Sequence, residues 1–226
     1  MLLNDFIALF YPDLCLVCGN NLLKHEEYIC ITCLHKTPKT NCFKQRENEV
    51  SKIFWGRSKL ENAAALFTFN KDRNTKKLIH TLKYEEGGNV GVFLGKQLAF
   101  AIKESEFFKS IDIVISVPLH PKKQKIIGYN QSDFIAQGIK EILNIKVNKQ
   151  SLIRIENTDS QRRKKRFNRW ENMMNSFDLR SSKKLRRKHI LLVDDVITTG
   201  STLEACAQKL QEVEAVKVSI ETIAVA

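Results

Sequence analysis

The segment 190–202, Ile-Leu-Leu-Val-Asp-Asp-Val-Ile-Thr-Thr-Gly-Ser-Thr, constrains the fold of this chain more than any other stretch. Its four leading apolar residues predict a buried central strand of a parallel sheet. In open α/β folds, ligands bind beyond the carboxyl ends of such strands. The acidic and hydroxyl residues that follow are therefore expected at a ligand-binding edge.

These following residues suit a phosphorylated sugar. Gly200 allows a close backbone approach, and the N–H and hydroxyl groups around it can surround a phosphate at the start of a helix. The two acids can accept hydrogen bonds from ribose hydroxyls or hold a hydrated Mg²⁺. A single Asp or Thr before a helix can be only a capping residue, but the complete pattern favours a ligand. The predicted phosphate- and ribose-binding residues are Asp194, Asp195, Thr198, Thr199, Gly200, Ser201 and Thr202.

The same segment resembles the signature of the phosphoribosyltransferase superfamily, whose members bind phosphoribosyl pyrophosphate (PRPP) with Mg²⁺. Ser201 stands where Gly or Ala is commoner in that signature. The resemblance implies Mg²⁺ with PRPP as the ligand of the loop.

The rest of the chain alternates between predicted strands and helices. Such alternation is typical of a doubly wound, mainly parallel α/β sheet. With the resemblance, it predicts a type I phosphoribosyltransferase-like domain over residues 55–226. The further predicted strands are 63–69, 111–117 and 216–224, and the predicted helices are 70–84, 90–103, 132–143 and 201–213.

Two Cys-x2-Cys pairs lie near the N-terminus, Cys15 with Cys18 and Cys30 with Cys33. Intracellular thiols stay reduced, and four thiolates suit a tetrahedral structural Zn²⁺. An iron–sulfur cluster is the alternative. Because this region has little apolar sequence with which to fold unaided, we expect residues 1–54 to form a small four-cysteine zinc-finger module with a polar connector at 40–52.

Lysine and arginine total 37 against 25 aspartates and glutamates, a formal net charge of +12. Such an excess attracts polyanions, although it can also serve only solubility. Clusters at 120–125 and 162–169 favour an anionic ligand, while a third at 183–188 is explained equally well by a solvated surface. The predicted DNA or phosphate contacts are Lys122, Lys123, Lys125, Arg162, Arg163, Lys165, Arg166 and Arg169.

Hydrophobic residues make up 43% of the chain, and no stretch approaches the roughly 20 apolar residues of a membrane span. The first ten residues lack the basic region and cleavage site of a signal peptide. We therefore expect a cytoplasmic protein without a membrane span.

Motifs along nearly the whole chain resemble the competence protein F (ComF) family, bacterial proteins with a zinc finger before a phosphoribosyltransferase-like domain. Ile127 departs from that pattern, because the family usually has Arg before this glycine, and Lys164 stands where an apolar residue is common. The motifs are Tyr11-Pro12-x2-Cys15-x2-Cys18-Gly19, Leu82-Lys83-Tyr84, Val117-Pro118-Leu119-His120, Gly128-Tyr129-Asn130-Gln131-Ser132, Arg154, Thr158, Gln161, Arg169-x2-Asn172-x4-Phe177 and the segment 190–202.

The resemblance implies a pyrophosphate-side loop at Val117, Pro118, Leu119 and His120. It also implies a role in natural transformation, beside a helicase-like ATPase and recombination mediators. We therefore expect an accessory protein of DNA uptake that binds single-stranded DNA and PRPP or a nucleic-acid 5′-phosphate. An active PRPP-dependent phosphoribosyltransferase of nucleotide metabolism and a PRPP-sensing regulator are the alternatives. Glutamine amidotransferase activity is not expected, because no N-terminal nucleophilic cysteine or glutaminase domain is present.

Overall fold

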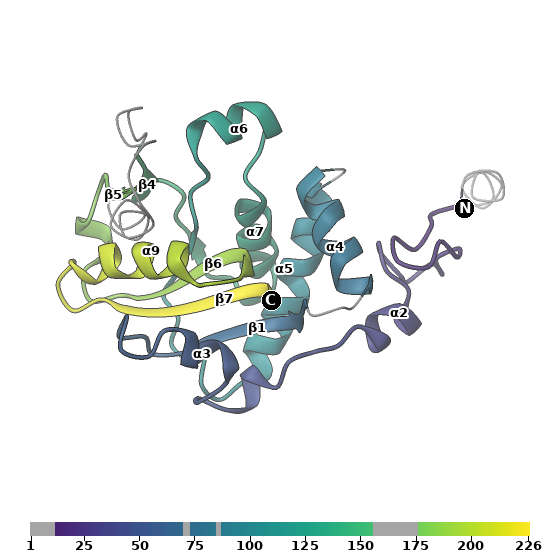
Figure 1. The fold of residues 1–226 in the computed structure, drawn as a ribbon, viewed down its shortest axis with the longest axis horizontal. Helices are drawn as coiled ribbons and strands as arrows, with labels where there is room; N and C mark the ends of the chain where they lie inside the picture. Colours follow the sequence, from purple (N-terminus) through teal and green to yellow (C-terminus); the bar gives the residue numbers. More distant parts are fainter. Residues whose placement is uncertain (1–11, 70–72, 85–86, 156–175) are drawn as a thin grey trace.

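The computed structural model describes residues 12–69, 73–84, 87–155 and 176–226 (Figure 1). Its centre is a five-stranded sheet with the order β1-β7-β6-β2-β3, in which all neighbouring strands run parallel. The predicted mainly parallel α/β sheet is confirmed. The strands are β1 (Ala63–Thr68), β2 (Ile113–Ser116), β3 (Lys146–Val147), β6 (His189–Ile197) and β7 (Lys217–Val225).

Helices cover both faces of the sheet. In Figure 1, α9 (Ser201–Gln211) lies in front of β6 and β7, while α5 (Gly87–Glu104) and α7 (Gln131–Leu143) lie behind. The helix α4 (Arg73–Tyr84) packs beside α5. The helices α5 and α7 cross closely because glycine leaves room at the crossing. A Cβ on Gly138 of α7 would lie 2.1 Å from the carbonyl oxygen of Val92 on α5.

The strand β6 is longer than the sequence predicted. Its pairing with β7 continues to Ile197, beyond the expected end at Val193. Asp194 pairs with Thr222 inside the sheet, so the acid pair belongs to the last part of the strand. The backbone of the acid pair is therefore held by hydrogen bonds between β6 and β7 and does not lie in a loop.

The connector at 40–52 contains structure that the sequence did not predict. Asn48 caps the short helix α3 (Glu49–Ile53) by accepting from the Val50 and Ser51 N–H groups. Val50 and Phe54 are fully buried, and α3 packs on β1. A few tertiary contacts stabilise this helix, and five residues are too few to show apolar periodicity. Before it come α2 (Ile31–Lys36) and the 3₁₀ turn η1 (Cys42–Lys44).

A short helix and a pair of short strands stand at the carboxyl edge of the sheet. The helix α6 (Pro121–Ile127) projects from the body between β2 and α7 (Figure 1). His120 caps its start, and Gly128 ends it in the left-handed conformation, with φ 86°. The strands β4 (Leu152–Arg154) and β5 (Phe177–Leu179) pair antiparallel, and Arg154 lines the same pocket as residues of α6. The 3₁₀ turn η3 (Lys183–Leu185) precedes β6.

Among the described helices, none has the length and apolar character needed to cross a membrane.

Candidate functional site

Asp194 and Asp195 form the centre of the site at the carboxyl end of β6. The Asp194 carboxylate accepts from the Ser132 hydroxyl at 2.9 Å and from the Asp195 N–H at 2.9 Å. The Asp195 carboxylate lies 3.1 Å from Lys83 Nζ, which comes from α4. Burial and the neighbouring Asp195 charge raise the pKa of Asp194 to about 7. The pair therefore combines one carboxyl that resists ionisation with one held beside a cation.

These acids line a pocket of roughly 250 Å³, called here the carboxylate pocket. Cations border it from three elements: Lys83 on α4, Lys123 on α6 and Arg154 on β4. The Arg154 guanidinium carbon lies 5.2 Å from the centre of the Phe177 ring. Carboxylates on one wall and cations on the others fit a ligand with both hydroxyl and phosphate groups. The pocket is lined by Lys83, Val117, Pro118, Leu119, Lys123, Ile127, Asn130, Gln131, Ser132, Arg154, Asp194, Asp195 and Thr202.

The segment 198–202 borders a second, smaller hollow of roughly 50 Å³ that shares Asp194 and Thr202 with the carboxylate pocket. Gly200 has φ 74° and is the N-cap of α9, an eleven-residue helix. The N-terminus of such a helix favours an anion through its free N–H groups and its dipole. The predicted phosphate-binding residues at 198–202 are thus brought beside the acid pair.

An arginine from the N-terminal side holds this segment in place. Arg57 donates to the Thr199 carbonyl oxygen at 3.0 Å and forms an ion pair with the buried Glu204 of α9. A Cβ on Gly200 would meet Ile53 at 2.9 Å and Phe54 at 3.1 Å. Only glycine fits at this point, because the backbone is left-handed and the end of α3 packs against it.

The residues of the predicted pyrophosphate-side loop have two different roles in the structure. Val117, Pro118 and Leu119 line the carboxylate pocket, whereas His120 accepts from the Lys122 N–H and caps α6. Asn130 ties the loop to α7 by donating to the Val117 carbonyl oxygen at 3.0 Å. The base of the α6 projection is therefore held by Asn130.

The structure describes only some of the basic residues that were predicted to contact DNA or phosphate. Lys122, Lys123 and Lys125 are exposed on α6, and Lys123 alone of them lines the pocket. The cluster Arg162, Arg163, Lys165, Arg166 and Arg169 lies outside the described residues.

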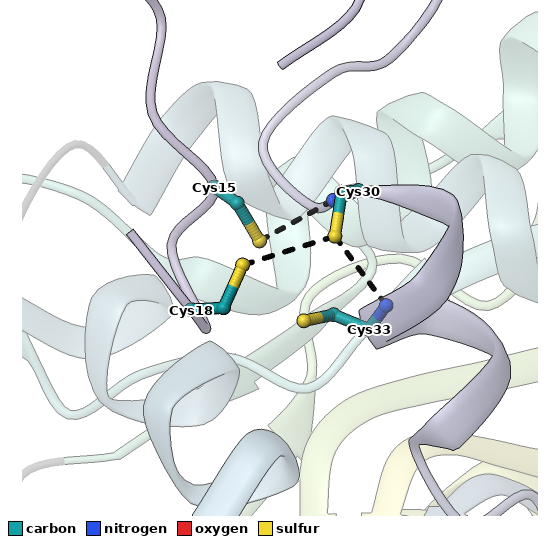
Figure 2. Close-up of side chains that lie close together, drawn as sticks. All are labelled: Cys15, Cys18, Cys30 and Cys33. Atoms are coloured by element: carbon teal, nitrogen blue, oxygen red, sulfur yellow. Dashed lines mark hydrogen bonds between the residues drawn. The ribbon is translucent and has the colours of Figure 1, made fainter. Parts of the chain in front are cut away.

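The four paired cysteines come together away from the sheet. Their sulfur atoms all lie within 4.8 Å of one another, an arrangement that can hold a metal ion (Figure 2). Burial opposes ionisation of Cys15, but N–H groups of Cys18, Cys30 and Val17 point at its sulfur and lower its pKa to about 6. A donor set of four thiols fits a soft or borderline cation such as Zn²⁺.

Several residues with contacts at the site were not among the predicted site residues; besides Lys83, Arg154 and Arg57, they include Ile127, Asn130, Gln131 and Ser132. Lys83 and Arg154 stand in the family motifs quoted above, so a signal for them was present in the sequence. Arg57 lies in no motif, and its partner Glu204 is 147 residues away. No local pattern could have paired these two residues.

In comparisons with known proteins, residues 134–226 match the phosphoribosyl transferase domain family. Competence protein F of Haemophilus influenzae is 32% identical over 139 residues, covering 60% of this chain and 61% of that protein. The DNA utilization protein YhgH of Salmonella typhimurium is 30% identical over 136 residues, covering 59% of each. The predicted resemblance to the competence protein F family is confirmed, and the match spans about three fifths of each relative's length.

Two solved structures of phosphoribosyltransferases match part of this chain. The glutamine PRPP amidotransferase of B. subtilis, complexed with ADP and GMP, is 23% identical with a TM-score of 0.43, covering 63% of this chain and 30% of that one. A hypoxanthine phosphoribosyltransferase from Staphylococcus aureus is 18% identical with a TM-score of 0.34, covering 59% and 61%.

Proposed function

Because this chain is similar to competence protein F and carries a phosphoribosyl transferase domain, we propose that it is an accessory protein of DNA uptake. It binds single-stranded DNA through basic surfaces, and PRPP with Mg²⁺, or a nucleic-acid 5′-phosphate, at the carboxylate pocket. The names of the relatives, competence protein F and DNA utilization protein, support the DNA role.

One observation supports the proposed binding of a phosphoribosyl ligand. The acid pair of β6 and the start of α9 border two hollows that share Asp194 and Thr202. A 5-phosphate in the smaller hollow places the ribose hydroxyls beside the carboxylates. Lys83, Lys123 and Arg154 then supply positive charge for further phosphates. Mg²⁺ would be held by carboxylate and phosphate oxygens, and it would neutralise pyrophosphate charge.

The four-cysteine cluster is proposed to hold a structural Zn²⁺. All four ligands are protein thiols, so no coordination position is left open for a substrate. Helicase-like and recombination partners remain predictions from the family resemblance. The cytoplasmic location remains a prediction from the N-terminal sequence.

Calorimetry with Mg²⁺-PRPP tests the pocket. The wild-type protein is expected to bind, and Asp195→Asn is expected to bind about tenfold or more weakly, because a hydrogen bond to a charged group contributes roughly 1.5–3 kcal/mol. Asp178→Asn, at an exposed acid on β5 outside the pocket, is the matched control. Equal affinity of wild type and Asp195→Asn would show that the ligand does not use this carboxylate.

A second candidate function is phosphoribosyl transfer, which the position of Val117, Pro118 and Leu119 on the pocket wall favours. In this reading, the backbone N–H of Leu119 contacts the departing pyrophosphate and Lys123 neutralises its charge. The Val117 N–H is already donated to the Val193 carbonyl oxygen, and Pro118 has no N–H. Pyrophosphate release from PRPP in the presence of nucleobases or amines supports transfer. Binding of PRPP without any release is the result expected of the accessory role.

A further inference from the structure

A second large hollow lies at the β3 edge of the sheet, outside the carboxylate pocket. Its volume is roughly 1200 Å³, and its walls come from the starts of β2 and β6, from β3, and from the residues just before β4 and just after β5. Five cations and a single acid, Asp112, stand among its lining residues. We call it the β3-edge groove; its cations are Lys146, Lys149, Arg180, Lys184 and Lys188.

The positive charge of this groove is largely uncompensated. Lys188 lies 3.0 Å from Asp112, and Lys149 lies 3.6 Å from Asp133. Lys146, Arg180 and Lys184 are exposed and have no carboxylate partner within ion-pair distance among the described residues. Because exposed like charges repel one another, a groove of this kind attracts a polyanion that spans several cations at once.

The surface between the cations is aliphatic and half-buried. Ile111, Ile145 and Val147 line the groove, and Asn148 and Gln150 add amide groups. Such a surface accepts the exposed sugars and bases of a single strand, while phosphates pair with the cations. In the part of the chain that the structure describes, no aromatic side chain lines the groove, so stacking does not contribute and the expected binding does not depend on base sequence.

The groove is distinct from the carboxylate pocket but adjoins it. Ser151 lines the groove and Arg154 lines the pocket, three residues farther along an extended chain. This separation is about 10 Å. A nucleic acid in the groove therefore leaves the pocket open to its own ligand.

We propose that the β3-edge groove is the site at which this protein binds single-stranded DNA, mainly through the phosphate backbone. This inference rests on the proposed function, which names the ligand but not its place. It assigns a role to the cluster at 183–188, which the sequence alone explained equally well as a solvated surface.

The test measures the affinity of a fluorescent oligothymidylate at several salt concentrations. The triple variant Lys146→Gln, Arg180→Gln, Lys184→Gln removes three cations that have no described acid partner. Each phosphate contact to a single strand contributes about 0.7 to the slope of log affinity against log salt, so the slope is expected to fall by about 2. Affinity near 0.1 M salt is expected to fall at least tenfold. The control Lys59→Gln, Lys103→Gln, at exposed lysines outside the groove, is expected to keep the wild-type slope.

A second measurement uses the unaltered protein. Oligothymidylate is expected to protect Lys146 and Lys184 from amine-reactive labelling and to leave Lys103 reactive. If wild type binds DNA while the triple variant keeps the same affinity and slope and neither lysine is protected, the groove is not the site. If wild type binds no single-stranded DNA at all, the proposed function itself fails.

Discussion

At the scale of single residues, Glu221 is a carboxyl group in the centre of the sheet. It lies fully buried on β7, and its two oxygens have no hydrogen-bond partner among the described residues. Burial raises the pKa of Glu221 well above its ordinary value. The folded protein therefore holds a proton that the unfolded chain releases once the pH exceeds the ordinary pKa of glutamate.

Glu221→Gln is expected to remove this pH dependence. In the wild type, the contribution of Glu221 lowers the free energy of unfolding as pH rises above about 4.5, by up to about 1.4 kcal/mol per pH unit. The loss continues until the folded-state pKa is reached. Urea unfolding of both proteins between pH 4 and pH 8 measures the difference. The exposed Glu106→Gln is the control. Parallel stability curves for Glu221→Gln and wild type would mean that Glu221 is ionised when buried.

Arg57 gives a second expectation at this scale. Arg57→Ala leaves the carboxylate of Glu204 buried without its cation and frees the Thr199 carbonyl group. We expect a loss of roughly 1–3 kcal/mol in the free energy of unfolding and weaker Mg²⁺-PRPP binding. Adding Glu204→Gln is expected to restore part of the stability, because the buried charge is gone, but not the binding.

The matched control for Arg57 is Arg46→Ala. Arg46 is exposed and lies 3.8 Å from Glu61, so its removal is expected to change stability by less than about 1 kcal/mol. Unfolding curves and calorimetry measure both variants. An unchanged PRPP affinity in Arg57→Ala would show that the loop keeps its shape without this side chain.

At the scale of elements, the crossing of α5 and α7 depends on glycine from both sides. A Cβ on Gly95 would lie 2.2 Å from the Ile135 carbonyl oxygen, and one on Gly138 would lie 2.1 Å from that of Val92. Both neighbours are backbone atoms, which cannot rotate away. Gly138→Ala is expected to lower the free energy of unfolding by about 3 kcal/mol, since the helices must separate.

Gly88→Ala is the control on α5. Its added Cβ would meet only the Phe134 ring at 3.2 Å, and alanine favours the helix by up to about 1 kcal/mol. We therefore expect little change or a small gain in thermal stability. A comparable loss in both variants would contradict the close crossing as the cause.

Helices and strands whose apolar residues recur at a regular spacing were predicted from the sequence. Elements that form only because of contacts with neighbouring segments were not. The strands β1 and β7 and the helices α7 and α9 carry apolar patterns, and all four were predicted within a few residues. The helix α6 was not predicted, because its sequence Pro-Lys-Lys-Gln-Lys-Ile-Ile has no buried face. The two residues of β3 are a strand only because they pair with β2.

At the scale of the whole molecule, the four-cysteine module joins the sheet domain through a few contacts. Lys77 of α4 donates to the Val17 carbonyl oxygen at 2.6 Å, and the rings of Tyr28 and Phe93 meet edge to face at 5.7 Å. If the cysteines hold the module together through zinc, Cys15→Ser is expected to release the metal and unfold residues 14–37. The sheet is expected to remain folded.

Metal content and hydrogen exchange measure this outcome. His35→Ala is the control, because His35 is exposed and is not one of the four ligands. It is expected to keep one zinc per chain. A full zinc content in Cys15→Ser would show that the ligand set is wrong.

The candidate site was predictable where its residues are consecutive. The segment 194–202 stands in one stretch of sequence, so its chemistry could be interpreted directly. The cations around the pocket come from α4, α6 and β4, and only folding brings them together. The same holds for Ser132 and Asp194, which are 62 residues apart and share a hydrogen bond.

The packing of Gly200 against Ile53 and Phe54 bears on how this protein can be divided. A fragment that begins at the predicted boundary, residue 55, would retain every strand of the sheet and the complete segment 190–202. It would lack the two side chains that contact Gly200. We therefore expect that chimaeras between relatives keep the shape of the loop at 198–202 only when residues 48–57 are transferred together with it.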